Sequence, residues 1–158
     1  MNKGLKILIL RMSSAGDIVH GLPVAAALKR YLPGCEVSWL VEDRFASLLE
    51  NNPTIDNTYV IPRREWKGWS LWSKARETGR IIKSLRTIHF DVSLDLQGLT
   101  KSAIAGKLSG IPKRIGFAGY EGKEISKQLN NIKIEADAEH VVKKNRQLLK
   151  ALNINNPE

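Results

Sequence analysis

Apolar residues in this chain gather in short runs that alternate with longer segments of helical periodicity. Residues 5–10 form an almost continuous apolar run, interrupted only by Lys6, which is typical of a strand buried on both faces of a sheet. Similar runs predict further strands at residues 36–41, 58–61, 91–96 and 114–117. Helices are predicted over residues 18–31, 44–50, 70–88, 100–108 and 141–152. This alternation predicts an α/β fold with a doubly wound parallel sheet covered on both faces.

Three places depart from the regular alternation. Pro23 lies within the first helical segment, where it either kinks the helix or marks the first turn of its regular part. Residues 119–137 are polar and poorly periodic, and we predict a loop with short helical pieces there. Residues 153–158 have a linker-like composition after a packed helix. We therefore expect one domain over residues 1–152 and the start of a linker at 153–158.

The composition fits a globular domain in a reducing, cytoplasmic compartment. The 158 residues are 42% hydrophobic and 26% charged. Cys35 is the single cysteine of the chain, which excludes an intramolecular disulfide and a four-cysteine metal site. No stretch approaches the roughly 20 apolar residues that span a bilayer. No histidines and carboxylates share a metal-ligand spacing in the sequence, so we predict no metal.

A basic excess indicates an anionic partner. The net charge is +9, and residues 60–90 hold eight Lys and Arg against two Glu. Charge alone does not choose between nucleic acid, a membrane surface and phosphorylated small molecules, and a solvated basic face is the plain alternative. Trp66, Trp69 and Trp72 recur every three residues among these cations. They suit a membrane interface or base stacking, and core packing competes with both.

The turn Ser13-Ser14-Ala15-Gly16-Asp17 follows the first predicted strand, where open parallel sheets bind ligands. Free amides at the start of the next helix attract anions or polar groups. The dinucleotide and P-loop fingerprints are both absent from this turn. Two interpretations of Asp17 remain open from the residues alone: a helix N-cap, or a general base that takes a proton from a sugar hydroxyl. His20 lies near enough in sequence to tune this carboxylate, or is a surface histidine.

The segment from Asp95 to Ser102 repeats this design after another predicted strand. Gln97 offers an amide suited to sugar hydroxyls, and Lys101 suits a carboxylate or phosphate. An ordinary turn with polar residues is the alternative. His140 begins the last helix, where a structural or surface role is the plain interpretation.

The ordered set of these segments resembles the N-terminal half of glycosyltransferase family 9, the lipopolysaccharide heptosyltransferases, most closely those of the heptosyltransferase I type. The resemblance rests on Lys6-Ile7-Leu8-Ile9, Arg11-Met12-Ser13-Ser14-Ala15-Gly16-Asp17-Ile18-Val19-His20, Leu22-Pro23, Trp39-Leu40-Val41-Glu42, Phe45, Ile61-Pro62-Arg63-Arg64, Trp66-Lys67, Asp95-Leu96-Gln97-Gly98-Leu99, Lys101-Ser102, Ile115-Gly116-Phe117 and His140. These pieces occur in the family's order along essentially the whole chain.

The resemblance implies the acceptor domain of a GT-B enzyme with two Rossmann-like domains, the second of which, outside this chain, binds the nucleotide-sugar donor. Such enzymes are metal-independent and inverting, use no cofactor, and transfer heptose from ADP-heptose to the Kdo region of the lipopolysaccharide inner core. The acceptor is an anionic, lipid-linked sugar, so a peripheral position on the cytoplasmic face of the inner membrane is expected. The 158-residue chain by itself is expected to be inactive.

By the family's pattern Asp17 is the catalytic base, and Ser13, Ser14 and Ala15 line the cleft around it. The same pattern assigns acceptor contacts to Arg63, Arg64, Lys67, Gln97, Lys101 and His140. The family often has Ala-Arg-Glu-Pro before the last helix, where this chain has Gly122-Lys123-Glu124-Ile125. Lys123 keeps the charge of that arginine as an acceptor contact but loses its bidentate geometry.

Two other classes of function make distinct predictions. A non-catalytic Rossmann-like module would capture an anionic glycan or lipid headgroup without transferring a sugar. A nucleic-acid-binding protein would carry basic residues that track a backbone, with an affinity that falls steeply with salt. Because the candidate residues converge on strand ends instead, no nucleic-acid partner is expected.

Overall fold

The computed structural model describes residues 4–119, 124–155 and 157. Its strands are β1 (Lys6–Leu10), β2 (Glu36–Glu42), β3 (Asn57–Ile61), β4 (Val92–Asp95), β5 (Lys113–Phe117) and β6 (Ile132–Ile134). Its α-helices are α1 (Ala15–Tyr31), α2 (Leu71–Ile88), α3 (Thr100–Leu108), α4 (Glu124–Leu129) and α5 (Val141–Gln147). Two 3-10 helices are η1 (Asp43–Leu49) and η3 (Leu148–Leu152).

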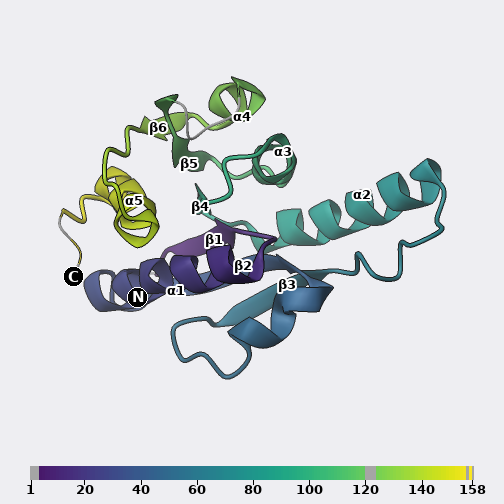
Figure 1. The fold of residues 1–158 in the computed structure, drawn as a ribbon, viewed down its shortest axis with the longest axis horizontal. Helices are drawn as coiled ribbons and strands as arrows, with labels where there is room; N and C mark the ends of the chain where they lie inside the picture. Colours follow the sequence, from purple (N-terminus) through teal and green to yellow (C-terminus); the bar gives the residue numbers. More distant parts are fainter. Residues whose placement is uncertain (1–3, 120–123, 156, 158) are drawn as a thin grey trace.

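All six strands pair in parallel in the order β3-β2-β1-β4-β5-β6, which is the strand order of the Rossmann fold (Figure 1). The predicted α/β, doubly wound parallel sheet is therefore confirmed. Ile7 of β1 is in register with Val37 of β2 on one side and Val92 of β4 on the other. The chain builds outward from β1 to β3 and then returns to β4, so the order reverses between β1 and β4. Ligands of such sheets bind beyond the carboxyl ends of these strands.

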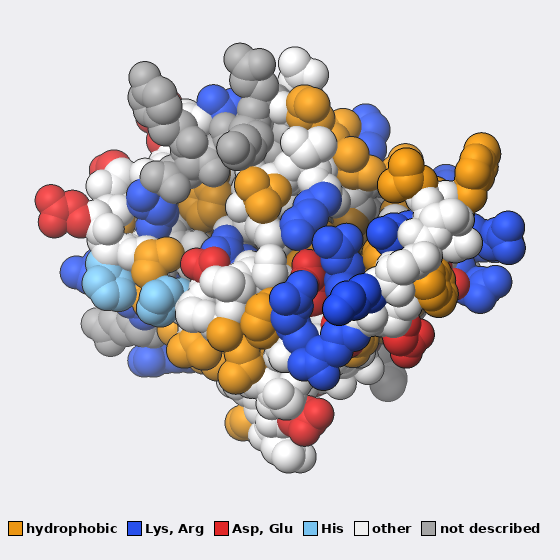
Figure 2. Space-filling view, turned by 45° about the vertical axis from the view of Figure 1, so that its right-hand side comes forward, with side chains coloured by type: hydrophobic (Ala, Val, Ile, Leu, Met, Phe, Trp, Pro, Cys, Tyr) orange, Lys and Arg blue, Asp and Glu red, His pale blue; other side chains and the backbone are white. Residues whose placement is uncertain are grey.

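Helix α2 extends away from the sheet, and its N-terminus lies at the end of the molecule farthest from α5 (Figure 1). Leu85, near its C-terminus, is its one fully buried residue. Leu71 and Trp72, at its N-terminus, are each 83% exposed. Hydrophobic side chains stand out at the same edge of the space-filling view, beside Lys and Arg (Figure 2). Only one end of this helix is thus anchored in the core.

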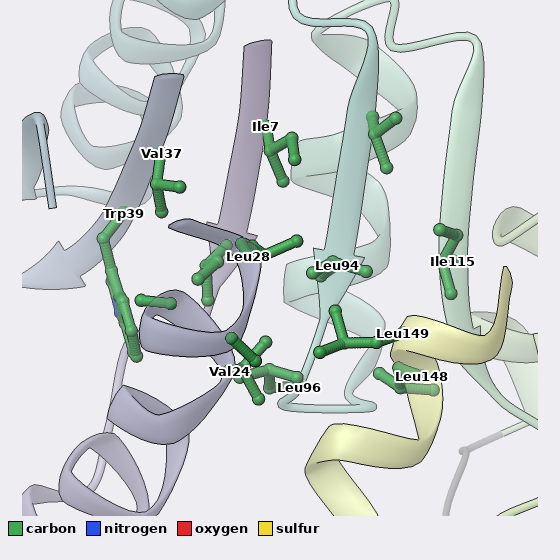
Figure 3. Close-up of a cluster of buried hydrophobic side chains, with 14 of the residues drawn as sticks. Ile7, Val24, Leu28, Val37, Trp39, Leu94, Leu96, Ile115, Leu148 and Leu149 are labelled. Atoms are coloured by element: carbon green, nitrogen blue, oxygen red, sulfur yellow. The ribbon is translucent and has the colours of Figure 1, made fainter. Parts of the chain in front are cut away.

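Alternating residues of the central strand feed two cores, one on each face of the sheet. Ile7 and Ile9 belong to the larger core, which α1 and η3 cover, whereas Leu8 and Leu10 belong to the smaller core beneath α2 and α3. The larger core is drawn in Figure 3, with side chains of α1 and η3 meeting those of the sheet. A Cβ on Gly21 of α1 would come within 2.8 Å of the Trp39 ring, so glycine lets this helix approach the sheet closely.

The structure differs from the sequence prediction at β6, at η1 and at the start of α1. The segment 119–137 contains a sixth strand, β6, which was predicted to be a loop because its pattern covers only three residues. The predicted helix over 44–50 is the 3-10 helix η1. Pro23 is in the interior of α1, which starts earlier than predicted because Ser14 caps it. In the segment expected to begin a linker, Ile154 is buried against the larger core.

Candidate functional site

Asp17 lies in the first turn of α1, three residues after the N-cap residue Ser14. Its Oδ2 accepts hydrogen bonds from the Ser14 hydroxyl at 2.8 Å and the Ser14 amide at 3.2 Å. Its Oδ1 forms an ion pair of 2.7 Å with Nη2 of Arg11. The interpretation of Asp17 as the N-cap is therefore wrong, since Ser14 holds that position and Asp17 bonds back to it as the acidic member of a capping box.

Opposing effects act on the pKa of the Asp17 carboxyl. Partial burial raises this pKa, but the hydrogen bonds from Ser14 and the guanidinium of Arg11 lower it by more, so it lies below its usual value. The side chain remains 39% exposed. An ionised, accessible carboxylate at the carboxyl end of β1 can accept a proton from a bound hydroxyl.

Arg11 joins the two turns that flank the switch point of the sheet. Its Nη1 donates a hydrogen bond of 2.5 Å to the carbonyl of Leu96, at the end of β4. Its own carbonyl accepts a hydrogen bond of 2.9 Å from the indole of Trp39. The side chain is 14% exposed, so the guanidinium is held from several sides beside Asp17. Sequence reasoning assigned no role to Arg11, although a single arginine directly after a buried strand is a signal for one.

Gln97 connects the same turns from the other side. Its Oε1 accepts a hydrogen bond of 2.8 Å from the Met12 amide, and its Nε2 donates one of 3.4 Å to the hydroxyl of Ser13. The structure thus brings Ser13 and Gln97 together, whereas Ser14 and Asp17 bond to each other beside Arg11. The primary amide of Gln97 links the turn after β1 to the turn after β4.

Asp95, the last residue of β4, supports the turn that carries Gln97. Its Oδ1 accepts a hydrogen bond from the Gly98 amide and its Oδ2 accepts one from the Asn130 side chain, each at 2.9 Å. Burial raises the pKa of the Asp95 carboxyl, and these hydrogen bonds offset part of that effect. Asp95 is fully buried, so it positions the turn from below.

Glu42, the last residue of β2, is the centre of a cluster of cations. Its side chain is 5% exposed and lies 3.4 Å from Arg44, 3.8 Å from Arg63 and 3.5 Å from Lys101. Its amide donates a hydrogen bond of 3.0 Å to the carbonyl of Met12. We call Glu42, Arg44, Arg63 and Lys101 the Glu42 cluster. Sequence reasoning assigned no role to Glu42, and an acidic residue ending an apolar strand was its only signal.

The remaining predicted residues lie around this centre. Ala15 is the exposed first residue of α1, and Arg64 and Lys67 are exposed in the loop after β3. The Arg64 amide donates to the Asp43 carboxylate at 3.0 Å. Figure 2 shows Lys and Arg side chains gathered on this face. Lys123 lies outside the described residues.

His20 and His140 pair with each other. His140 is the N-cap of α5, where its Nδ1 accepts a hydrogen bond of 3.2 Å from the Val142 amide. Its ring centroid lies 6.5 Å from that of His20 in an edge-to-face arrangement. The hydrogen bonds and ion pair of Asp17 come from Ser14 and Arg11, and His20 is not among them.

The start of α1 has open space beside Gly16. A Cβ on Gly16 would meet no atom within 4 Å, so the backbone at the start of α1 is open on that side. In the part of the chain that the structure describes, no group of three or more His, Cys, Asp or Glu is arranged to hold a metal ion.

The three tryptophans of the basic segment divide between core and surface. Trp66 is buried, 6% exposed, with the Arg63 guanidinium 5.7 Å from its ring centroid. Trp69 is 39% exposed and Trp72 is 83% exposed. The predicted aromatic edge is therefore wrong for Trp66, whose indole packs inward, whereas Trp72 remains available at the surface.

The chain matches a known protein family and several of its members. Residues 78–158 match glycosyltransferase family 9 (heptosyltransferase). Lipopolysaccharide heptosyltransferase 1 of Campylobacter coli is 33% identical over 104 residues, which cover 66% of this chain and 28% of that protein. Lipopolysaccharide heptosyltransferase 1 of Pseudomonas aeruginosa is 30% identical over 148 residues, which cover 91% of this chain and 41% of that protein.

A solved structure shares the fold. E. coli heptosyltransferase WaaC with ADP-2-deoxy-2-fluoro heptose superimposes with a TM-score of 0.85 at 24% identity, over 98% of this chain and 50% of that chain. The chain thus spans half or less of the length of each of these three relatives. The family match covers about half of the chain, and the predicted resemblance is confirmed: this chain belongs to glycosyltransferase family 9, the heptosyltransferases.

Proposed function

We propose that this chain is the acceptor-binding domain of an inverting glycosyltransferase that moves heptose from ADP-heptose to the Kdo region of the lipopolysaccharide inner core. The observation that carries the proposal is the ionised Asp17 carboxylate, held by Arg11 and Ser14 beyond the carboxyl end of β1. Membership of the family supports the reaction class. The relatives that bear the heptosyltransferase name support heptose as the transferred sugar.

In the proposed reaction Asp17 takes the proton of an acceptor hydroxyl. The hydroxyl oxygen forms a bond to the anomeric carbon of heptose as the bond from that carbon to the ADP phosphate breaks, and ADP leaves with the electron pair. Attack opposite the leaving group inverts the anomeric centre. Because the pKa of Asp17 is low, proton transfer becomes favourable only as the new C–O bond forms and the hydroxyl becomes acidic. Arg11 and Ser14 are positioning residues that aim the carboxylate.

The acceptor is held, in this proposal, by the basic residues around the site. Arg63 and Lys101 of the Glu42 cluster, with Arg64 and Lys67 beside them, suit the carboxylates of Kdo and the phosphates of its lipid anchor. Glu42 fixes the first two cations through its buried carboxylate. Ser13, Ala15, Gln97, Lys123 and His140 are proposed as further acceptor contacts.

The proposed reaction also needs a donor site and access to a membrane-bound acceptor. A second domain holds the phosphates of ADP-heptose, so the 158-residue chain alone gives no turnover. No metal ion or cofactor takes part. In the described part of the chain, no helix has the length and apolarity to cross a membrane. We propose peripheral attachment to the cytoplasmic face of the inner membrane, with Leu71 and Trp72 entering the lipid interface beside the cations of α2.

A binding experiment on the 158-residue chain tests the acceptor role. The probe is Kdo-containing lipid A from which the acyl chains have been removed, and ADP-heptose is the comparison ligand. We expect the sugar acceptor to bind the wild-type chain. The double substitution Arg63→Gln with Arg64→Gln should weaken acceptor binding by about tenfold. The exposed control Arg80→Gln should leave acceptor binding unchanged. Absence of acceptor binding, or equal loss in the control, contradicts the proposal.

A further inference from the structure

A cavity of about 220 Å³ lies between α2, α3 and the sheet, next to the Glu42 cluster. Its walls are largely apolar and include Leu40, Ile61, Ile81, Ile82, Leu85 and Ile104. Glu42, Arg63, Trp66 and Lys101 also line it. The cavity therefore joins a hydrocarbon-like interior to a charged group at one end.

The packing of α2 explains why the space exists. Of the residues of α2 that line the cavity, Leu85 is buried, whereas Ile81 and Ile82 are half-buried and Thr78 is exposed. Apolar side chains on the inner side of a helix ordinarily pack against a neighbour at close to crystal density. Here Ile81 and Ile82 remain half-buried, so the cavity is an apolar space that an apolar group would fill favourably.

The charged end favours an anion. The side chains of Arg63 and Lys101 are 47% and 46% exposed, and both reach Glu42 at 3.5 Å or more, which is long for a charge-assisted hydrogen bond. Donor capacity therefore remains for an incoming oxygen. Glu42 offsets one charge, and the cations of the cluster outnumber it.

Trp66 supplies an independent observation. This residue is 6% exposed, lines the cavity, and its indole N–H has no hydrogen-bond partner among the described residues. A buried donor without a partner costs free energy, so this part of the cavity wall is not fully satisfied by the described residues of the chain itself.

We propose that the cavity binds the alkyl chain of an anionic amphiphile, whose head group lies at Arg63 and Lys101. Because an apolar cavity of about 150 Å³ is known to hold benzene, the volume here suits about eight carbon atoms of such a chain. The head group shares Arg63 and Lys101 with the proposed acceptor site, so this part of the inference rests on the proposed function, whereas the tail lies in an apolar space that Asp17 does not line.

Isothermal titration of the 158-residue chain tests the proposal with three probes below their micelle concentrations. Octyl phosphate carries both head and tail, octyl glucoside has the same tail with a neutral head, and inorganic phosphate has no tail. We expect octyl phosphate to bind at least about a hundredfold more tightly than inorganic phosphate, because the tail leaves water. We expect it to bind about fivefold more tightly than octyl glucoside, because the rim cations are half-exposed. Equal affinity for octyl phosphate and inorganic phosphate overturns the proposal.

Substitutions locate the tail. Ala105→Leu and Thr78→Leu each place a larger side chain in the cavity wall. We expect each to weaken the binding of octyl phosphate by about tenfold or more. Ala75→Leu, an exposed change on α2 outside the cavity lining, is the matched control and should leave the affinity unchanged. Circular dichroism and thermal unfolding verify each fold, and the exposed position of Thr78 keeps the test valid if Ala105→Leu does not fold. If the folded cavity variants bind normally and Leu71→Ser loses binding instead, the tail lies on the exposed end of α2 and the proposal is wrong.

Discussion

Arg11 and Asp17 form an ion pair of 2.7 Å at the carboxyl end of β1, and the same guanidinium donates a hydrogen bond of 2.5 Å to the Leu96 carbonyl. The position of the carboxylate therefore depends on β4 as well as on its own helix. Ser14 adds two hydrogen bonds from the other side. Together these contacts give Asp17 one orientation before any ligand arrives.

Removing the guanidinium should destabilise the fold and raise the pKa of Asp17. For Arg11→Gln we expect the free energy of unfolding to fall by about 1–3 kcal/mol, because the Leu96 carbonyl loses a charged donor in a part-buried site. Urea denaturation measures the first effect and an NMR titration of the Asp17 carboxyl measures the second. Arg80→Gln breaks an ion pair with Glu77 in which the arginine is 72% exposed, and should change neither quantity appreciably. An unchanged Asp17 pKa in Arg11→Gln contradicts this account.

The low pKa of Asp17 makes its contribution to stability depend on pH. Its pKa is lower in the folded than in the unfolded state, so the contribution is present above the unfolded pKa of about 3.9 and is lost as pH falls through the lower folded value. Since the side chain is 39% exposed, the contribution at neutral pH is at most about 1 kcal/mol. Denaturation of the wild type and Asp17→Asn at a series of pH values should show a difference that shrinks in acid. A constant difference throughout argues against the ion pair as its source.

A substitution at Gly16 should change stability and acceptor affinity in opposite directions. Gly16→Ala should raise the free energy of unfolding by up to about 1 kcal/mol, because alanine favours the helix and the added Cβ meets nothing within 4 Å. The same methyl group occupies the open side of the site, so acceptor affinity should fall by about tenfold. Gly79→Ala, in α2, also places its Cβ in open space and is the matched control. It should stabilise the fold without changing affinity, and equal affinity of both variants would place the acceptor away from Gly16.

Glu42 organises cations from three separate segments. Glu42→Gln should lower the free energy of unfolding by about 2 kcal/mol, because three cations lose a buried counter-charge. The loss should diminish at high salt, since the cations are half-exposed. Urea denaturation at low and high salt measures it, with the exposed Glu65→Gln as control. Equal effects of the two substitutions would show that the Glu42 cluster contributes nothing specific.

The fold was predictable where local pattern and tertiary structure agree. The apolar run at Lys6–Leu10 is buried as predicted because both faces of β1 carry a core. The three-residue β6 was not predictable, because its strand conformation depends on pairing with β5 and three residues are too few to show a strand pattern. The place of Asp17 after a strand singled it out as a candidate, whereas its role as the base came from the family resemblance and stays a prediction. Arg11 and Glu42 were not, because their partners Leu96 and Lys101 lie 85 and 59 residues away in sequence.

The most direct test of the central claim is heptose transfer by the full-length enzyme that the proposal implies. ADP-heptose and a Kdo-containing acceptor are the substrates, and the wild type is compared with Asp17→Asn, which nearly preserves shape but not basicity. We expect kcat to fall by a factor of about 10²–10⁴, the range for loss of a general base. Acceptor binding and thermal stability should change little. Turnover of Asp17→Asn within about twofold of the wild type would contradict the assignment of Asp17 as the base.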